Sequence, residues 1–280
     1  MREAVAAALL PGPGKLLVDA TCGAGGHSEY LLTSCPGLRI VALDKYASAA
    51  DHARRRLECF AGATVRCGGY ERIRELFAEQ GIPGMDGILF DLGFSTMQIT
   101  DPERGFSFRM EGPLDMRFSR ETSLTAGEIV NRWDGPRLME IFEEYGEVPR
   151  AKKIVEALIE RRRRQPFVST RDLADFIASR SRFHGRTHPA TLFFQGLRIA
   201  VNDELNTLRT GLEQACGLLV PGGRMVVISF HSLEDRIVKQ FMRNEPSLAV
   251  ITKKPVVAPL DEVRRNPESR SAKLRIAEKR

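Results

Sequence analysis

The residues best suited to chemistry in this chain of 280 residues surround a glycine-rich turn near its start. The segment Leu16–Ser28 reads LLVDATCGAGGHS, so an apolar run ends in an aspartate and continues into closely spaced glycines. This pattern predicts a buried strand, a tight turn and a helix N-terminus, the corner that holds nucleotide-like ligands in doubly wound α/β proteins. Glycine suits the turn because it lacks a Cβ and tolerates positive φ. A plain strand–turn–helix connection is the alternative.

Acidic residues at two predicted strand ends favour a cationic ligand for this corner. Asp19 occupies a place where a pyrophosphate would be repelled, and Ser28 takes the third glycine position of a dinucleotide fingerprint counted from Gly23. The run RIVAL (39–43) ends on Asp44, which is placed to accept the hydroxyls of an adenosyl ribose. S-adenosylmethionine carries an ammonium and a sulfonium and no phosphate. The two acids therefore favour this methyl donor over a nicotinamide dinucleotide.

A third acid, Asp91, follows the predicted strand GILF (87–90). A carboxylate at this strand end can accept a proton or a hydrogen bond from an amine that is being methylated. The exocyclic amine of a nucleobase is a weak nucleophile, so it must be held in line with the donor methyl. Capping of the following turn is the alternative role for Asp91. The Asp/Asn/Ser-Pro-Pro-aromatic tetrapeptide common among such enzymes is replaced by DLGF in this chain.

A second polar cluster, SFHSLEDR (229–236), follows the last clear predicted strand, Arg224–Ser229. It places His231 and Ser232 at the carboxyl edge of the sheet, where they are candidate catalytic residues in contact with substrate. A helix start with Ser232 as its cap is the structural alternative. A serine hydrolase is disfavoured, because the two residues are adjacent and no G-x-S-x-G elbow is present.

Two further segments, RGFSF (104–108) and GPLDMRF (112–118), mix aromatic and basic residues. In a loop, such residues can stack an unpaired base and hold its backbone. Anchoring of the loops in a hydrophobic core is an equal alternative for the phenylalanines. The candidate substrate-binding residues are Arg104, Phe106, Phe108, Asp115 and Arg117.

Composition limits the class of protein. The formal net charge is +6, with basic clusters at Arg161–Arg164 and from Arg264 to Arg280, which indicate either solvated surface or contacts with nucleic acid.

The sequence contains no apolar run of about 18 residues, so no membrane span is expected. We interpret the N-terminus as a helix rather than a signal peptide. Five cysteines without a C-x-x-C pair favour reduced thiols in a cytoplasmic protein. His184 and His188 lack the context of a zinc site, so no metal is expected.

The elements that position these residues alternate up to about residue 100. The predicted strands are Leu16–Ala20, Arg39–Leu43, Thr64–Cys67 and Gly87–Phe90, and the predicted helices between them are Ser28–Thr33, Ala47–Phe60 and Tyr70–Gln80. This rhythm predicts a parallel sheet with right-handed crossovers. Residues 102–188 show only helical patterns and turns, and a long helix at Leu192–Leu218 then leads back to a strand. We therefore expect a Rossmann-like α/β sheet domain (1–101 and 189–280) with an inserted helical substrate domain (102–188).

Taken together, these segments make the chain resemble the ribosomal RNA small subunit methyltransferase H family. The segments that carry the resemblance are GGHS (25–28), DGILFDLGFST (86–96), ERGFSF (103–108), GPLDMR (112–117), YGE (145–147), HPAT (188–191), FQGLRIAVNDEL (194–205), PGGRMVVISFHSLEDRIVK (221–239) and RSAKLRIAEK (270–279). The resemblance implies transfer of a methyl group from S-adenosylmethionine to N4 of a cytidine in the decoding region of 16S rRNA, within the small ribosomal subunit. It also implies that the helical insertion helps to hold the RNA.

The resemblance further implies which residues bind the donor. The matching positions in this chain are Gly25, Gly26, His27, Asp44, Tyr70, Asp91 and Gln98. The chain departs from the family pattern at Cys22 and Ala24 in the glycine turn and at Tyr46–Ala47 after the second strand, and its N-terminal segment is short. These departures motivate an alternative: a catalytically inactive RNA-binding protein of ribosome assembly with the same fold.

Overall fold

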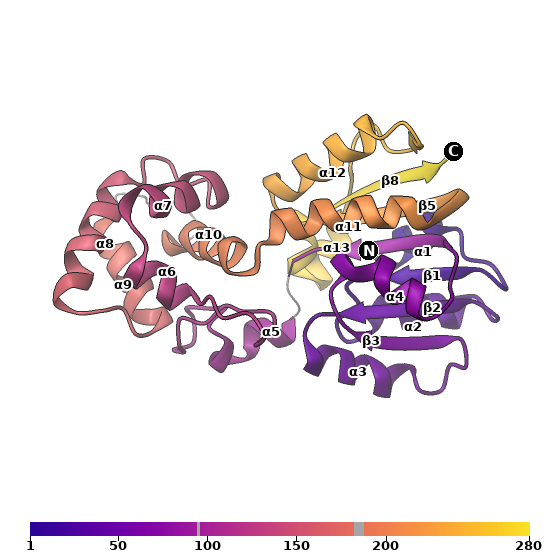
Figure 1. The fold of residues 1–280 in the computed structure, drawn as a ribbon, viewed down its shortest axis with the longest axis horizontal. Helices are drawn as coiled ribbons and strands as arrows, with labels where there is room; N and C mark the ends of the chain where they lie inside the picture. The colour runs from indigo at the N-terminus through magenta and orange to yellow at the C-terminus, as the bar shows by residue number, and fades with distance from the viewer. Residues whose placement is uncertain (94–95, 182–187) are drawn as a thin grey trace. The chain divides into compact units, whose positions relative to one another are not determined.

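The protein divides into two compact units in the computed structural model, which describes residues 1–93, 96–181 and 188–280 (Figure 1). The sheet unit comprises Met1–Gly93 and Leu205–Arg280, and the helical unit comprises Phe94–Glu204. The helical unit is therefore an insertion in the sequence of the sheet unit. The boundaries between the two units lie after residues 93 and 204, whereas the sequence analysis places the domain boundaries after residues 101 and 188.

The sheet unit is built on one eight-stranded sheet with the order β3-β2-β1-β4-β5-β8-β6, and β7 also pairs with β8. Its strands are β1 (Leu16–Asp19), β2 (Arg39–Asp44), β3 (Ala63–Cys67), β4 (Met85–Asp91), β5 (Leu219–Ser229), β6 (Leu248–Val250), β7 (Val256–Val257) and β8 (Lys273–Lys279). The first five are parallel, and β8 is antiparallel to β5. The predicted parallel sheet is confirmed, and the four predicted N-terminal strands each lie within two residues of the observed bounds.

Helices cover both faces of the sheet. Those of the sheet unit are α1 (Arg2–Leu9), α2 (Gly26–Ser34), α3 (Ala47–Leu57), α4 (Ile73–Glu79), α11 (Glu204–Leu218), α12 (Ser232–Asn244) and α13 (Leu260–Arg265), with short 3-10 turns at Tyr70–Arg72 and Pro267–Ser271. In β1, Leu16 and Val18 pack with α4, α11 and α12, whereas Leu17 packs with α1, α2 and α3. This alternation is the period of two of a strand that is buried on both faces.

The C-terminal strand β8 was not predicted, because its charged residues hide the strand pattern. Arg275 donates to both carboxylate oxygens of Asp235, at 2.7 and 3.1 Å. Lys279 donates from Nζ to the carbonyl oxygen of Cys216 at 3.0 Å and to Ser247 Oγ at 2.9 Å. These partners allow long basic side chains to lie on a strand between β5 and β6. Part of the basic C-terminal cluster therefore belongs to the sheet rather than to a solvated tail.

The helical unit has its own hydrophobic core. Its helices are α5 (Thr96–Thr100), α6 (Ala126–Arg132), α7 (Gly135–Glu140), α8 (Lys152–Arg164), α9 (Thr170–Arg180) and α10 (Ala190–Asn202), with a 3-10 turn at Pro102–Arg104 and a π-helix at Ile141–Tyr145. Side-chain caps begin three of them, including Ser169, whose Oγ accepts from the Asp172 amide. The core includes Phe142 and Phe193, with ring centroids 4.8 Å apart.

The predicted helix Leu192–Leu218 is wrong in one respect, because the chain forms two helices that separate at Asp203. This residue has a left-handed φ of 47°, which ends α10. Beside the break, Arg198 donates to both carboxylate oxygens of Glu204, at 2.7 and 2.9 Å, and both side chains are nearly buried. A buried bidentate pair fixes the turn geometry. Since α10 contributes Phe193 and Leu197 to the helical core, the helical unit extends beyond residue 188.

Truncation of Phe142 tests the core of the helical unit. Phe142 is fully buried, so Phe142→Ala should lower the free energy of unfolding by about 3–5 kcal/mol, because the smaller side chain packs less well and leaves a cavity. Trp133, the only tryptophan of the chain, packs against this core, so its fluorescence during urea unfolding reports on the unit. Phe142→Leu is the control and should cost about 1 kcal/mol. An unchanged urea midpoint in the alanine variant would contradict this account of the core.

Candidate active site at the carboxyl ends of the parallel strands

The glycine turn joins the carboxyl end of β1 to α2. Gly25 caps α2 with a left-handed φ of 81°, and its amide donates to the Cys22 carbonyl oxygen at 2.7 Å. A Cβ on Gly25 would lie 3.4 Å from the Ala53 backbone on α3. Any other residue at this position would therefore have both an unfavourable φ and a close neighbour. The first amides of α2 are therefore presented at the edge of the sheet beside β1 and β4, where the strand order reverses direction.

Asp19 is the most deeply buried acid of this edge. It lies at the end of β1 with 2 % of its surface exposed, and its Oδ2 accepts from the Ser28 hydroxyl at 2.7 Å. Its Oδ1 has no hydrogen-bond partner in the described structure. Burial raises the pKa of the Asp19 carboxyl to about 6, although the nearby His27 and the Ser28 hydroxyl partly offset it. A cationic group placed at this oxygen would repay the cost of burying the charge.

Asp44, at the end of β2, is a clamp for the backbone. Its Oδ2 accepts from the Gly23 amide and its Oδ1 from the Tyr46 amide, each at 2.8 Å. Burial raises the pKa of Asp44, and the two amide hydrogen bonds act in the opposite direction. The carboxylate thus ties the glycine turn to the start of α3, and each oxygen keeps a further lone pair for the hydroxyl of a ligand.

Asp91 lies at the end of β4, and its side chain is 29 % exposed, whereas Asp19 is buried. Its Oδ2 is 3.4 Å from His27 Nε2, and its amide donates to the Thr21 hydroxyl at 2.7 Å. Asp91 Oδ1 and His27 Nδ1 are buried and have no partner among the described residues. The structure therefore brings His27 and Asp91 together next to the glycine turn, as predicted for residues of one site. Thr21, which positions Asp91, carried no signal in the sequence.

Tyr70 follows β3 and packs against the edge of Phe90, with ring centroids 5.2 Å apart. A Cβ on Gly211 of α11 would lie 2.3 Å from the Tyr70 ring. Gly211 therefore lets the ring lie against α11, a requirement that was not apparent from the sequence. The predicted contact of Tyr70 with the donor stays a prediction.

His231 and Ser232 begin α12 just beyond the carboxyl end of β5. His231, not Ser232, is the cap residue, which corrects the alternative considered for Ser232. Glu234 Oε2 accepts from the Phe230 amide at 2.9 Å, while Glu234 Oε1 lies 3.2 Å from His231 Nε2. Both imidazole nitrogens are buried, and Glu234 Oε1 is the polar neighbour that the described structure places next to Nε2. The catalytic role of His231 and Ser232 stays a prediction.

The predicted substrate residues lie in the helical unit and pack against it. Phe106 stacks on Phe118 with centroids 5.4 Å apart, and Phe108 contacts the rings of His188 and Phe194 at 4.7 and 4.9 Å. These contacts support the core-anchor alternative for the two phenylalanines. Their stacking with RNA stays a prediction.

Asp115 and Arg117 form a local clamp. Arg117 donates to both carboxylate oxygens of Asp115, at 2.9 and 2.7 Å, and to the Thr122 carbonyl oxygen at 2.7 Å. Burial alone raises the pKa of Asp115, but the hydrogen bonds from Arg117 outweigh it and hold that pKa below its ordinary value. Arg104 has a side chain that is 14 % exposed, with Nε 3.9 Å from the Asp101 carboxylate. The Asp115–Arg117 ion pair therefore stabilises the loop that carries the candidate RNA contacts.

Two other predictions concern the helical unit. Gln98 lies on α5 and is 6 % exposed, and its contact with the donor stays a prediction. In the Arg161–Arg164 block, Arg161 pairs with Asp172 at 2.6 Å. Arg162 donates to the Val130 and Trp133 carbonyl oxygens at 2.7 and 2.6 Å. Half of this block therefore supports helix packing. His184 lies outside the described residues.

The buried charge of Asp19 predicts opposite effects of pH on stability and on donor binding. Because its folded-state pKa is raised, the stability associated with its protonated form is complete below pH 3.8 and is lost as the pH rises through about 6. Asp19→Asn should therefore raise the free energy of unfolding above pH 6 by on the order of 2–3 kcal/mol, and by little below pH 4.

The same substitution should weaken binding of S-adenosylmethionine, since its ammonium favours the carboxylate. Calorimetry should show that wild-type affinity falls as the pH is lowered through 6, whereas Asp19→Asn loses this dependence. Ser28→Ala is the control, because it removes a hydrogen bond and keeps the charge. Equal donor affinity of wild type and Asp19→Asn at pH 8 would contradict the role of Asp19.

Filling the space at Gly211 should displace Tyr70. Gly211→Ala places a methyl group against the ring, so we expect donor affinity to fall about tenfold if the ring contacts the donor. Gly217→Ala on the same helix is the control, since its Cβ would meet only the end of the Arg74 side chain. Unchanged affinity in Gly211→Ala, with a fold that remains intact by circular dichroism, would remove Tyr70 from the donor site.

Comparison with known proteins identifies the family. The MraW methylase family matches residues 1–280. A protein of Nostoc sp. named "Ribosomal RNA small subunit methyltransferase H" is 46 % identical over 99 % of this chain and 90 % of its own length, and one of Thermomicrobium roseum with the same name is 45 % identical over 97 % and 90 %. The solved structure of a putative rRNA methylase from Clostridium thermocellum covers 100 % of this chain and 95 % of its own, with 14 % identity and a TM-score of 0.47. The chain belongs to the MraW methylase family and is an S-adenosylmethionine-dependent methyltransferase.

Proposed function

We propose that this protein transfers a methyl group from S-adenosylmethionine to the exocyclic N4 of a cytidine in the decoding region of 16S rRNA. The observation that carries the proposal is the set of three acids at the carboxyl ends of β1, β2 and β4 around the glycine turn. Among the residues that the structure describes, Asp19 and Asp91 each keep one buried oxygen without a hydrogen-bond partner, and Asp44 anchors the turn. This arrangement suits a ligand with a cationic group and a ribose.

Each residue of the edge has a separate task in donor binding. The glycine turn and the first amides of α2 allow close approach of the ligand. Asp19 supplies the buried negative charge that favours a cation, and Asp44 offers its remaining lone pairs to the ribose hydroxyls. Tyr70 follows β3 and packs against Phe90 of β4. The donor, when bound, supplies an electrophilic methyl group on a sulfonium.

Asp91 holds the amine that is methylated. The lone pair of N4 forms a bond to the methyl carbon while the bond from carbon to sulfur breaks, and the resulting ammonium must lose a proton. Asp91 Oδ1 is buried and unpartnered, so it is the acceptor for an N4 hydrogen and then for the proton. His27, 3.4 Å from Asp91 Oδ2, holds the carboxylate in place on its other side.

The substrate assignment rests on the relatives, whose name specifies ribosomal RNA of the small subunit. The net charge of +6 suits an RNA partner. We propose that the helical unit contacts the RNA through Arg104, Phe106, Phe108, Asp115 and Arg117, and that Gln98, His231 and Ser232 take part in the site. We also propose that the protein acts in the cytoplasm. No helix within the described ranges could span a membrane.

The departures from the family pattern do not disrupt the glycine turn. Cys22 is buried, and burial raises the pKa of its thiol, so it is a neutral side chain within the core. Its carbonyl oxygen still accepts the Gly25 amide, and its amide donates to the Leu43 carbonyl oxygen at 2.8 Å. Tyr46 is buried as the residue that precedes α3. The alternative of an inactive assembly protein is therefore less favoured than the enzyme.

Mapping of methylated cytidines in rRNA tests the proposal. Cells without the gene should lack one N4-methylated cytidine in the small-subunit rRNA, and the wild-type gene should restore it. Asp91→Asn keeps the shape of the side chain but lowers its basicity, so methyl transfer in vitro should fall by about 10²–10⁴-fold, with donor affinity nearly unchanged by calorimetry.

Asp86→Asn is the matched control, because Asp86 is an acid of β4 whose Oδ2 accepts from the Leu16 amide at 2.8 Å, away from the carboxyl edge. Its transfer rate should be close to that of wild type. RNA binding by the wild type without thermal stabilisation by S-adenosylmethionine would support the inactive assembly protein instead.

A further inference from the structure

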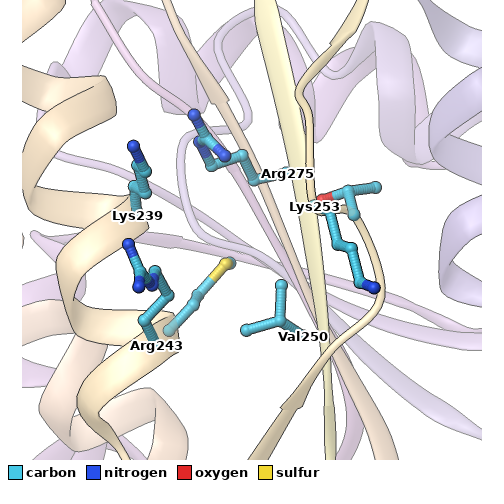
Figure 2. A pocket seen from close by; sticks show the side chains of 7 residues that line it. Lys239, Arg243, Val250, Lys253 and Arg275 are labelled. Carbon is cyan, nitrogen blue, oxygen red and sulfur yellow. The ribbon is translucent and has the colours of Figure 1, made fainter.

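A basic cleft lies in the sheet unit beside its last strands, and none of its lining residues belongs to the glycine turn (Figure 2). Its volume is about 320 Å³. Helix α12 forms one side, and the opposite side comes from β8, β6 and the segment after β6. The lining residues are Lys239, Met242, Arg243, Val250, Thr252, Lys253 and Arg275. We call this feature the α12–β8 cleft.

The cations of the cleft differ in whether the protein neutralises them. Arg275 is buried and pairs with Asp235, which also lies 3.7 Å from Lys273. Burial alone raises the pKa of Asp235, but the hydrogen bonds from Arg275 and the nearby lysines hold that pKa below its ordinary value. The single carboxylate of Asp235 is thus shared by several cations, so the cleft keeps a net positive charge.

That excess comes from Lys239, Arg243 and Lys253, which are exposed. Within the described ranges, none of the three forms an ion pair or a hydrogen bond with a protein acceptor. In Figure 2, Lys239 and Arg243 extend from α12 on one side, and Lys253 and Arg275 lie on the other. Several like charges around one hollow favour an anion between them.

The surface between the cations is partly apolar. Met242 is buried on α12, Val250 is at the end of β6, and Thr252 Oγ1 accepts from the Ile276 amide at 2.9 Å, which fixes this wall to β8. An apolar surface with a cationic rim suits a nucleotide unit, since the phosphate meets the cations and the base or sugar covers the apolar groups. Because the three unpaired cations are exposed, the cleft fits a polymer that crosses an open surface better than an enclosed small molecule.

The position of α12 connects the cleft to the proposed site. The helix begins at Ser232 beside the carboxyl end of β5. With a rise of about 1.5 Å per residue, Lys239 and Arg243 lie about 10 and 16 Å further along the helix. A strand of RNA whose target nucleotide is at the carboxyl edge can therefore pass along α12 and reach the cleft within a few nucleotides.

We propose that the α12–β8 cleft binds the phosphodiester backbone of the RNA substrate outside the target nucleotide. The inference rests on the proposed function in taking RNA as the substrate. It adds to the sheet unit an RNA-binding surface that is independent of the helical unit. Lys239, Arg243 and Lys253 bind the phosphates, and Arg275, fixed by Asp235, shapes the wall.

Removal of these charges tests the proposal. The double variant Lys239→Gln/Arg243→Gln should bind a labelled single-stranded, cytidine-containing RNA oligomer about tenfold more weakly at 0.1 M salt, and the slope of log affinity against log salt should fall by about 0.7 for each phosphate that is no longer neutralised. Lys253→Gln should lower the slope by one such step. With undermethylated small-subunit particles, KM should rise while kcat and the affinity for S-adenosylmethionine stay unchanged.

Arg55→Gln/Arg66→Gln is the matched control, because it removes the same charge from exposed positions on α3 and β3, near the opposite edge of the sheet, that have no ion-pair partner among the residues described. A salt slope in the cleft variant equal to that of this control would overturn the proposal. Two other results would also overturn it. Wild-type binding of inorganic phosphate as tight as that of the oligomer would assign the cleft to a free anion. Normal oligomer binding with poor methylation of particles would assign it to a ribosomal protein.

The oligomer experiment is independent of the proposed function. Failure to find the N4-methylated cytidine would reject the cytidine assignment while the salt slopes still report on the cleft. Conversely, unchanged slopes would reject the cleft as an RNA-binding surface and leave the methylation assignment intact.

Discussion

The charge of Asp19 is the constraint on which the site depends. This carboxylate is nearly excluded from water. Ser28 holds one of its oxygens, and the other has no hydrogen-bond partner in the described part of the chain, so the charge destabilises the folded protein at neutral pH. A bound ligand with a positive charge next to the Asp19 carboxylate offsets this destabilisation. The glycine turn, the α2 amides and the Asp44 clamp all surround this acid, and a ligand with a positive group is the occupant that removes the penalty.

The three acids have different roles because their surroundings differ. Asp19 is desolvated and lacks a second partner. Asp44 is buried too, but two backbone amides hold it, so its main structural effect is to close the turn against α3. Asp91 has a side chain that is 29 % exposed and lies next to His27. In the proposed mechanism, these three acids at neighbouring strand ends therefore have separate tasks: Asp19 supplies a charge for the donor, Asp44 supports the turn, and Asp91 accepts the proton.

Sequence patterns predict the strands and helices in which apolar side chains are buried and polar side chains are exposed. Strands β1, β2 and β4 are apolar runs that end in an acid, so both the strands and the acids were predictable. Strand β8 was not, because Arg275 and Lys279 find partners in α12 and in residues near α11 that are remote in sequence. The break at Asp203 was hidden for a similar reason. It depends on a left-handed residue beside the Arg198–Glu204 pair, within a stretch of continuous helical pattern.

The basic residues also differ in whether the protein supplies a partner for them, and only cations without a partner are available to bind RNA. The densest basic run, Arg161–Arg164, supplies two arginines to helix packing and carbonyl capping, so its charge density overstates its capacity for phosphate. Lys239, Arg243 and Lys253 do not form a basic run in the sequence, yet they line one cleft and have no ion-pair partner among the described residues. Affinity for a polyanion depends on cations that the protein leaves without an acid, and that property arises only when the strands and helices are in place.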